Sequence, residues 1–248
     1  RIHYAYTDVG GSAPNVVQDH ACIFYYVRSP RLYQVLDLYE RVKDVARGAA
    51  LMTGTELEIV LNDGLCDYVP NDVLSQLLYK SFCEVGGPQF STEEKALAAE
   101  FAKTFDPAAV ADKARTLSAH FGPEIAEQYK DQILVEDIFP YHATDLISSG
   151  STDVGDVSWV CPTAQVNTAC YASGTPGHSW QLVAQGKAPL AHAATLQAGR
   201  VMAGTVIDLF ESPELLEKAK AEHTARVGAG YVCPIPAGVK PRPMGAKQ

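Results

Sequence analysis

The stretch GTPGHSWQ, residues 174–181, places a histidine in a loop that glycine and proline define. Glycine permits positive φ and proline fixes φ, so the backbone rather than a helix face is expected to hold His178. A neutral imidazole is the commonest metal ligand in proteins and the usual general acid or base near neutral pH. His178 is therefore a candidate metal ligand or proton-transfer group, and the alternative is an ordinary solvent-exposed histidine.

A second candidate site pairs an amide with a guanidinium. Asn15 follows the Gly-Gly turn of TDVGGSAPN, and Arg28 ends the apolar segment that comes next. If the segments flanking the turn pair as strands, both side chains can project from one end of the sheet. They would suit a carboxylate, because arginine binds a carboxylate with two parallel hydrogen bonds. The residue types alone favour the simpler interpretation, a turn asparagine and a surface arginine.

The third candidate is the loop GSTDVGDVSWVCPT, which carries Asp153 and Asp156. Carboxylates in such a loop can orient a metal-binding histidine from behind, or they can cap the turn by accepting from its own amides. Both interpretations stay open. The other histidines are weaker candidates, because they stand in polar surroundings without convergent partners (His20, His120, His142, His223), open a helix (His192) or lie on the first expected strand (His3).

The composition excludes several classes of protein. A hydrophobic fraction of 47% with 20% charged residues fits a soluble globular protein, and a net charge of -9 argues against binding a nucleic-acid backbone. No apolar run approaches the roughly 18 residues that cross a bilayer, and no secretory leader is recognisable, so we expect a cytoplasmic protein without membrane contact. The abrupt start, RIHYAYTDV, suggests a portion of a longer protein. Six cysteines without a C-x-x-C pair predict free thiols (Cys22, Cys66, Cys83, Cys161, Cys170, Cys233).

The pattern of apolar residues predicts the elements that position these groups. Strands are expected at 2–9, 21–28 and 55–61, and a helix opened by Ser29 and Pro30 should continue to about residue 54. This order is typical of a small two-layer α+β domain.

Farther along, helices are expected at 72–85, capped by Asp72, and at 92–105, behind a capping box of Ser91 and Glu94. Two short helical patterns follow before residue 150. Strands at 156–162 and 164–172 should lead into the His178 loop, and helices should follow at 190–210 and from Ser212 on. Loops at strand ends are where α/β enzymes place their chemistry, which favours a functional His178.

Four motifs, in their order along the chain, resemble a known family: GGSAPNVVQD…FYYVR, GSTDVGDVSWVCPT, GTPGHSW and AHAATLQAGRVMAGTVIDL. They look like the C-terminal half of the B subunits of the aminobenzoyl-glutamate utilisation proteins, within the metal-dependent amidohydrolase, aminoacylase and glutamate carboxypeptidase superfamily. The resemblance implies an α/β fold class. Residues 1–66 would be part of a two-layer α+β lid and dimerisation domain. Residues 67–248 would be the C-terminal part of a metallopeptidase-like α/β catalytic domain, with a helical insert at about 90–150.

The resemblance also implies roles for the candidate residues. The asparagine and arginine that hold the substrate's free carboxylate in that family fall on Asn15 and Arg28, and its last metal ligand falls on His178. Two divalent ions, zinc or manganese, occupy each active site of the family. Its other metal ligands, bridging acid, general-base glutamate and lid histidine belong to the N-terminal half, so the segment alone is expected to be inactive.

The implied reaction is metal-dependent hydrolysis of the amide bond of p-aminobenzoyl-glutamate, a folate breakdown product, to p-aminobenzoate and glutamate. The implied partners are a second copy bound through the lid domain or the family's A-type subunit, in a hetero-oligomer. Two alternatives stay open. One is an amidohydrolase for another N-acyl amino acid or a short peptide, and the other is a non-catalytic dimerisation or assembly module.

Overall fold

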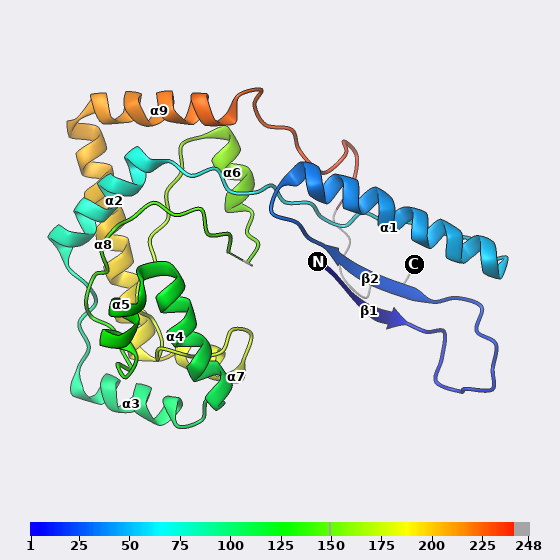
Figure 1. Ribbon diagram of the computed structural model, residues 1–248, viewed down its shortest axis with the longest axis horizontal. Coiled ribbons are helices and arrows are strands. Elements are labelled where there is room, and N and C mark those ends of the chain that lie inside the picture. The colour runs from blue at the N-terminus through cyan, green and yellow to red at the C-terminus, as the bar shows by residue number, and fades with distance from the viewer. Residues whose placement is uncertain (149, 241–248) are drawn as a thin grey trace. The chain divides into compact units, whose positions relative to one another are not determined.

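A computed structural model describes residues 1–148 and 150–240 and divides them into two compact units (Figure 1). Of the described residues, the first unit comprises 1–69, 147–148, 150–160 and 229–240, and the second comprises 70–146 and 161–228. Over the described residues the chain is mostly helical, with nine helices and one two-stranded sheet. The expected α/β class is therefore confirmed only in part, and the division into lid and catalytic domains stays a prediction.

The first unit opens with the predicted hairpin. Strands β1 (Ile2–Asp8) and β2 (Cys22–Val27) pair antiparallel, with Tyr4 opposite Tyr25. Helix α1 (Leu32–Thr53) follows, contacts β2 and ends before Gly54. The predicted strand–strand–helix order is confirmed for these elements.

The expected cap of α1 was wrong. Arg31, not Ser29, is the N-cap residue, and its amide donates to Gln34 Oε1 at 3.2 Å. The next amide, that of Leu32, donates to Asp67 Oδ1 at 3.0 Å. The helix begins beyond Pro30 because these two acceptors, one local and one distant in sequence, satisfy its first amides.

Three of the five expected strands do not form, and two of these segments are irregular. Residues 55–61 are irregular, and Leu57 and Ile59 are 42% and 40% exposed, because no neighbouring strand in the described chain provides a ladder. The segment 164–172 is also irregular. Its polar groups bond to distant residues instead: the Ala172 amide donates to Gln185 Oε1 at 2.7 Å, and Thr168 Oγ1 donates to the Ala194 carbonyl at 3.2 Å.

The strand expected at 156–162 is a helix instead, α6 (Val154–Val160). Its buried face carries Gly155 and Ser158, three residues apart, which is helical spacing. A Cβ at Gly155 would lie 2.3 Å from the Cys66 carbonyl oxygen, so only glycine lets α6 approach the 66–69 segment this closely. Seven residues are too few for the apolar pattern to separate a helix from a strand.

The second unit is helical. α2 (Asp72–Val85) packs against α8 (Pro189–Glu211) and α9 (Pro213–Val227), and α4 (Pro107–Phe121) packs against α5 (Pro123–Tyr129). The core cluster includes Phe90, Leu190 and several alanines. The long, small-residue helix α8 contacts other helices, namely α2, α7 (Trp180–Gly186) and α9. The unit also contains α3 (Thr92–Ala102).

Of the two capping predictions in this unit, one is confirmed and one is wrong. The Ser91–Glu94 box is confirmed: Ser91 Oγ accepts from the Glu94 amide at 3.2 Å, and Glu94 Oε2 accepts from the Ser91 amide at 2.7 Å. Asp72 is not the cap of α2. The preceding residue, the buried Asn71, accepts from the Leu74 amide at 3.0 Å. A helix begins where a side chain reaches its first free amides, and Asn71 does so here.

The state of the cysteines and the character of the helices also bear on the sequence predictions. The six cysteines are free thiols. Of the helices that the structure describes, none combines the length and apolar character needed to cross a membrane.

Candidate functional site

The predicted metal-ligand loop adopts an unusual backbone conformation at His178. Among the described residues, His178 is the only non-glycine with positive φ, at 56°, and its side chain is exposed. A left-handed conformation costs an L-residue roughly 1–2 kcal/mol. Such strain persists only where the surrounding structure enforces it, and it is concentrated at functional sites. The backbone therefore presents this imidazole to solvent at a cost in stability.

A buried glutamine holds the loop that carries His178. Gln185 of α7 is 0% exposed; its Oε1 accepts from the Ala172 amide at 2.7 Å and its Nε2 donates to Thr175 Oγ1 at 3.0 Å. At the other end, Ser179 donates to the Pro176 carbonyl at 2.7 Å and caps α7. Both flanks of the His178 turn are thus fixed by side chains that sequence analysis did not identify.

The predicted carboxylate-binding arginine lies in the first unit, beside another predicted motif. Arg28 directly follows β2, and its main chain pairs with that of Arg1 at N···O distances of 2.9 and 2.7 Å. Its Nη2 donates to Ser151 Oγ, 123 positions later in the chain. The structure therefore brings the arginine motif and the GSTD loop together, although sequence analysis did not pair them.

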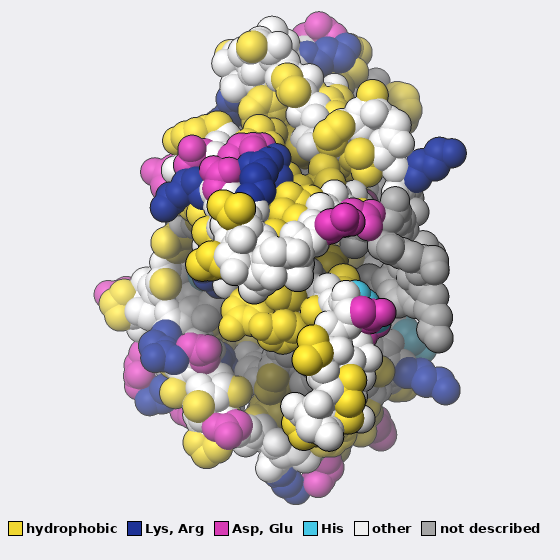
Figure 2. Space-filling model, turned by 90° about the vertical axis from the view of Figure 1, so that its right-hand side faces the viewer, with side chains coloured by type: hydrophobic (Ala, Val, Ile, Leu, Met, Phe, Trp, Pro, Cys, Tyr) yellow, Lys and Arg dark blue, Asp and Glu magenta, His cyan; other side chains and the backbone are white. Residues whose placement is uncertain are grey.

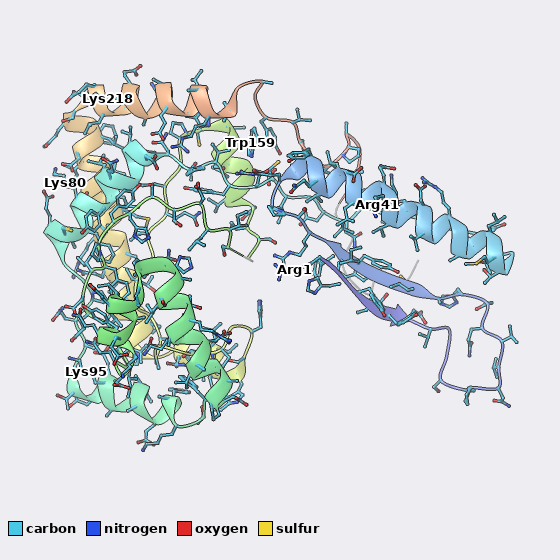
Figure 3. The ribbon with its side chains drawn as sticks, viewed as in Figure 1. Arg1, Arg41, Lys80, Lys95, Trp159 and Lys218 are labelled. Carbon is cyan, nitrogen blue, oxygen red and sulfur yellow. The ribbon has the colours of Figure 1, made fainter. Side chains whose placement is uncertain are left out.

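Helix α6 fixes the GSTD loop within this unit. Trp159 lies on α6 (Figure 3). Its indole donates to the Asp67 carbonyl at 2.7 Å, and Ser158 Oγ accepts from the Val69 amide at 2.8 Å. The carboxylate of Asp67 in turn binds the start of α1, through Arg31 at 3.0 Å and the Leu32 amide. Asp67 thus connects the helix that follows the GSTD loop with the helix that follows Arg28.

Of the two predicted carboxylates, Asp156 is already engaged. It accepts from the Cys66 amide and from the Tyr231 hydroxyl, each at 3.0 Å. Burial and the Asp156 carboxylate raise the pKa of the Cys66 thiol to about 12. The pKa of Tyr231 is also raised, by its hydrogen bond with Cys233, by burial and by Asp156. These contacts favour a structural role for Asp156, whereas Asp153 is exposed and lies in the turn before α6.

Asn15 lies in the exposed loop between β1 and β2, in the same unit as Arg28. His178 belongs to the other unit. The predicted convergence of Asn15, Arg28 and His178 on one substrate therefore stays a prediction. The same holds for the idea that Asp153 or Asp156 orients a metal-binding histidine.

The same loop holds a cluster that sequence analysis dismissed. His20 was expected to lack convergent partners, but its ring nitrogens lie 3.0 Å from Asp19 Oδ1 and 3.1 Å from Asp8 Oδ2. Hydrogen bonds that the imidazole donates to Asp19 and Asp8 raise the pKa of His20. The pKa values of both carboxyls are lowered, that of Asp8 by the Gly10 amide and by His20, and that of Asp19 by His20. Asp8 and Asp19 flank the loop between the strands, so the pairing depends on the hairpin, which the residue types alone do not reveal.

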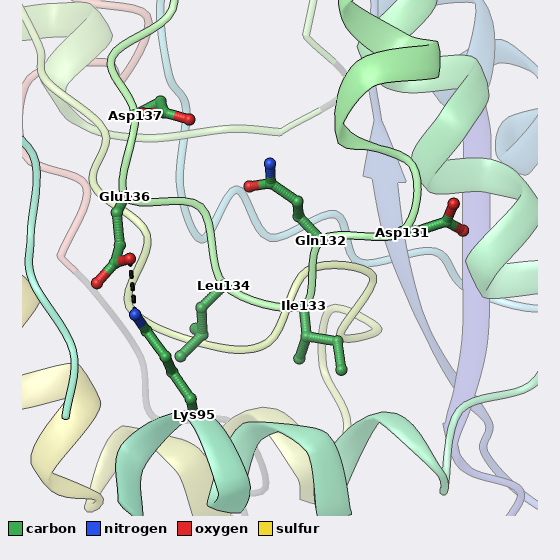
Figure 4. A pocket seen from close by; sticks show the side chains of 7 residues that line it. All are labelled: Lys95, Asp131, Gln132, Ile133, Leu134, Glu136 and Asp137. Carbon is green, nitrogen blue, oxygen red and sulfur yellow. Dashed lines mark hydrogen bonds and ion pairs between the residues drawn. The ribbon is translucent and has the colours of Figure 1, made fainter. Parts of the chain in front are cut away.

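A shallow pocket lies in the second unit, inside the predicted insert (Figure 4). In it, Lys95 lies 2.8 Å from Glu136, whose other oxygen accepts from the Phe90 amide at 2.8 Å, while Asp137 accepts from the Tyr129 hydroxyl at 2.9 Å. These groups satisfy one another and join α3 to the segment beyond α5. The pocket is lined by Lys95, Asp131, Gln132, Ile133, Leu134, Glu136 and Asp137.

The described residues do not by themselves fit a two-metal centre. The imidazole of His178 is a suitable donor, but within residues 1–148 and 150–240 no three His, Cys, Asp or Glu side chains gather closely enough to hold an ion. A catalytic zinc site takes at least three protein ligands. No step of a metal-dependent reaction can therefore be assigned to this chain alone.

Comparison with known proteins identifies relatives. The B subunit of p-aminobenzoyl-glutamate hydrolase from Escherichia coli (strain K12) is 38% identical over 98% of this chain and 52% of its own length. The Xaa-Arg dipeptidases of Homo sapiens and Mus musculus are 26% and 24% identical over 84% and 88% of this chain, and 36% and 39% of their own lengths. No family model matches.

The chain thus spans about half the length of its relative from Escherichia coli and little more than a third of the dipeptidases. Within those limits the similarity to the first relative extends over nearly all of this chain. The chain is a homologue of the p-aminobenzoyl-glutamate hydrolase B subunit and is related to Xaa-Arg dipeptidase.

Proposed function

We propose that this chain supplies the carboxylate-binding residues and one metal ligand of a metal-dependent amidohydrolase that cleaves p-aminobenzoyl-glutamate to p-aminobenzoate and glutamate. One observation carries the proposal: His178 is exposed, has a positive φ and lies in a loop that Gln185 holds in place. The resemblance implies a metal ligand at this position. The 38% identity to the B subunit of p-aminobenzoyl-glutamate hydrolase supports the choice of substrate.

Each predicted residue has one task in this proposal. His178 offers a neutral imidazole nitrogen to a zinc or manganese ion. Arg28 and Asn15 hold a carboxylate of the glutamate part, since a guanidinium and an amide provide donors that match carboxylate oxygens. The remaining ligands of a two-ion site and the general base are expected from outside this sequence, so the chain by itself is expected to be inactive.

The dipeptidase relatives support a second candidate, hydrolysis of a dipeptide or another N-acyl amino acid. A carboxylate-binding arginine would serve either substrate. A panel that pairs p-aminobenzoyl-glutamate with acetyl-glutamate and with dipeptides ending in arginine separates the two. A preference for the aromatic acyl group supports the first candidate, and a preference for arginine-terminated dipeptides supports the second.

For partners, we propose self-association through the first unit or pairing with a second type of subunit. Tyr4 and Tyr6 of β1 are 65% and 61% exposed, and Leu51 and Met52 of α1 are 85% and 83% exposed. Figure 2 shows that hydrophobic side chains reach the surface between charged ones on the face it presents. Exposed apolar side chains of this size are typical of protein interfaces. A cytoplasmic location also stays a prediction.

The test uses the natural protein that carries this sequence. We expect His178→Ala to remove bound zinc or manganese, measured by mass spectrometry of the metals. Hydrolysis of p-aminobenzoyl-glutamate should fall on the order of 100-fold or more, since losing a residue behind a ligand already costs about 10–100-fold. The matched control is His192→Ala, an exposed histidine of α8 in the same unit. Unchanged metal content and turnover in His178→Ala, or equal losses in both variants, would overturn the proposal.

A further inference from the structure

We infer that Ser151 is a positioning residue for substrate binding: its hydroxyl orients the guanidinium of Arg28 toward the carboxylate of the substrate. The inference rests on the proposed function, and it adds a residue that neither the motifs nor the comparisons assign.

The main chain of Arg28 is fixed, so the position of its guanidinium depends on what holds the side chain. Its main chain continues the β1–β2 ladder by one position, through both hydrogen bonds with Arg1. Beyond Cα, a free arginine side chain populates many rotamers, and fixing one of them costs conformational entropy. Unless another group restrains it, a carboxylate that binds the guanidinium must overcome this entropy at the moment of binding.

Ser151 contacts this side chain from a distant part of the sequence. Arg28 Nη2 donates to Ser151 Oγ. A serine oxygen occupies one donor of the guanidinium without neutralising its charge, because the hydroxyl is uncharged. An aspartate in this place would form an ion pair and compete with the substrate. The Ser151 hydroxyl thus orients one donor of the guanidinium without itself adding a counter-charge.

Ser151 belongs to a segment that leads into a fixed helix. It lies three residues before α6, and α6 is bound to the 66–69 segment through Ser158 and Trp159. That segment also binds the start of α1 through Asp67, and α1 begins four residues after Arg28. The contact therefore closes a ring of fixed elements within the first unit, which is what preorganisation of a binding group requires.

The test compares substrates with and without the carboxylate that Arg28 would bind. For Ser151→Ala in the natural protein we expect KM for p-aminobenzoyl-glutamate to rise about three- to tenfold, the scale of one hydrogen bond, with kcat within about twofold. With the α- or γ-carboxamide analogue, whichever is the weaker substrate of the wild type, Ser151→Ala should change KM little. Ser151→Thr keeps the hydroxyl and should restore KM. Ser148→Ala, in the same segment, is the matched control.

The outcomes separate this inference from the proposed function. Equal KM increases on all substrates, or no increase on the parent compound, would overturn the role of Ser151 while hydrolysis itself stands. If the wild type does not hydrolyse the compound, the proposed function fails, and the contact is tested without substrate. A double-mutant cycle of thermal stability between Ser151→Ala and Arg28→Lys should then show coupling, and additive effects would overturn the inference.

Discussion

Replacing Glu222 of α9 with glutamine is expected to destabilise the second unit at the start of α2. The Glu222 carboxylate accepts from the amides of Asp72 at 2.8 Å and Val73 at 3.0 Å, the first two residues of α2, and lies 2.8 Å from Arg226. The Glu222 side chain is 18% exposed, so solvent screens these contacts only in part. Glu222 thus joins two helices that are distant in sequence.

The expected size of the effect follows from these contacts. Hydrogen bonds to charged groups contribute about 1.5–3 kcal/mol and neutral ones about 0.5–1.5 kcal/mol. Glutamine keeps one oxygen as an acceptor but loses a negative charge at a helix N-terminus, which is worth about 0.3–1 kcal/mol. We therefore expect Glu222→Gln to lower the free energy of unfolding by about 2 kcal/mol.

Two measurements check this prediction. Urea denaturation gives the free energy of unfolding, and hydrogen exchange of the Asp72 and Val73 amides reports on the contact itself. The control is Glu217→Gln on the same helix, whose carboxylate is 71% exposed and pairs with Lys220 one turn away. That change should stay within about 0.5 kcal/mol. Equal effects of the two variants, or unaltered exchange at both amides, would refute the reasoning.

The same contacts predict a pH dependence. Burial favours the neutral form of Glu222, but the amides of Val73 and Asp72 together with Arg226 outweigh it, so the pKa of Glu222 is lowered. A carboxyl with a lowered folded-state pKa stabilises the fold above its unfolded-state pKa, and this contribution is lost as the pH falls through the folded-state value. The difference between wild type and Glu222→Gln should be complete near pH 7 and shrink below about pH 4. A difference that is constant down to acid unfolding would contradict this assignment.

Three further predictions concern single side chains. Gln185→Leu should lower the free energy of unfolding by about 2–3 kcal/mol in urea denaturation, because buried partners at Ala172 and elsewhere in the His178 loop lose their hydrogen bonds. His178→Gly should be as stable as wild type or more so, whereas His178→Val should lose about 1 kcal/mol in the same assay, because φ is positive there. The pKa of His20 in an NMR titration should lie above its ordinary value and fall in Asp8→Asn. Since the folded-state pKa of His20 is raised, its stabilisation is present below the unfolded-state pKa and is lost as the pH rises through the folded-state value.

The elements that sequence analysis predicted correctly depend on local interactions. The β1–β2 hairpin, the α3 capping box and the start of α9 at Pro213 follow from residues a few positions apart, or from two strands joined by one loop. The candidate His178 was found in the same way, because Gly and Pro around it marked a fixed loop. Its positive φ is consistent with that argument, but only the structure shows it.

The failures share one physical cause, partners that are distant in sequence. The cap of α1 shifted to Arg31 because Asp67 accepts the next amide, and the segment 164–172 is not a strand because Gln185 and other distant groups take its polar atoms. The residues within a few positions of either segment do not indicate these distant partners. Asp156 accepts hydrogen bonds from the Cys66 amide and the Tyr231 hydroxyl. Sequence analysis did not predict these contacts, because both partners are distant from Asp156 in the chain.

The sequence by itself therefore determined most of the helices and the hairpin, because residue type and spacing act within a few positions. The roles of Asn15, Arg28 and His178 follow from the resemblance and stay predictions. The tertiary structure alone decided that 154–160 is a helix and that Arg28 meets Ser151. A backbone amide or a guanidinium must find an acceptor, and when that acceptor lies 123 positions away only folding brings the two groups together.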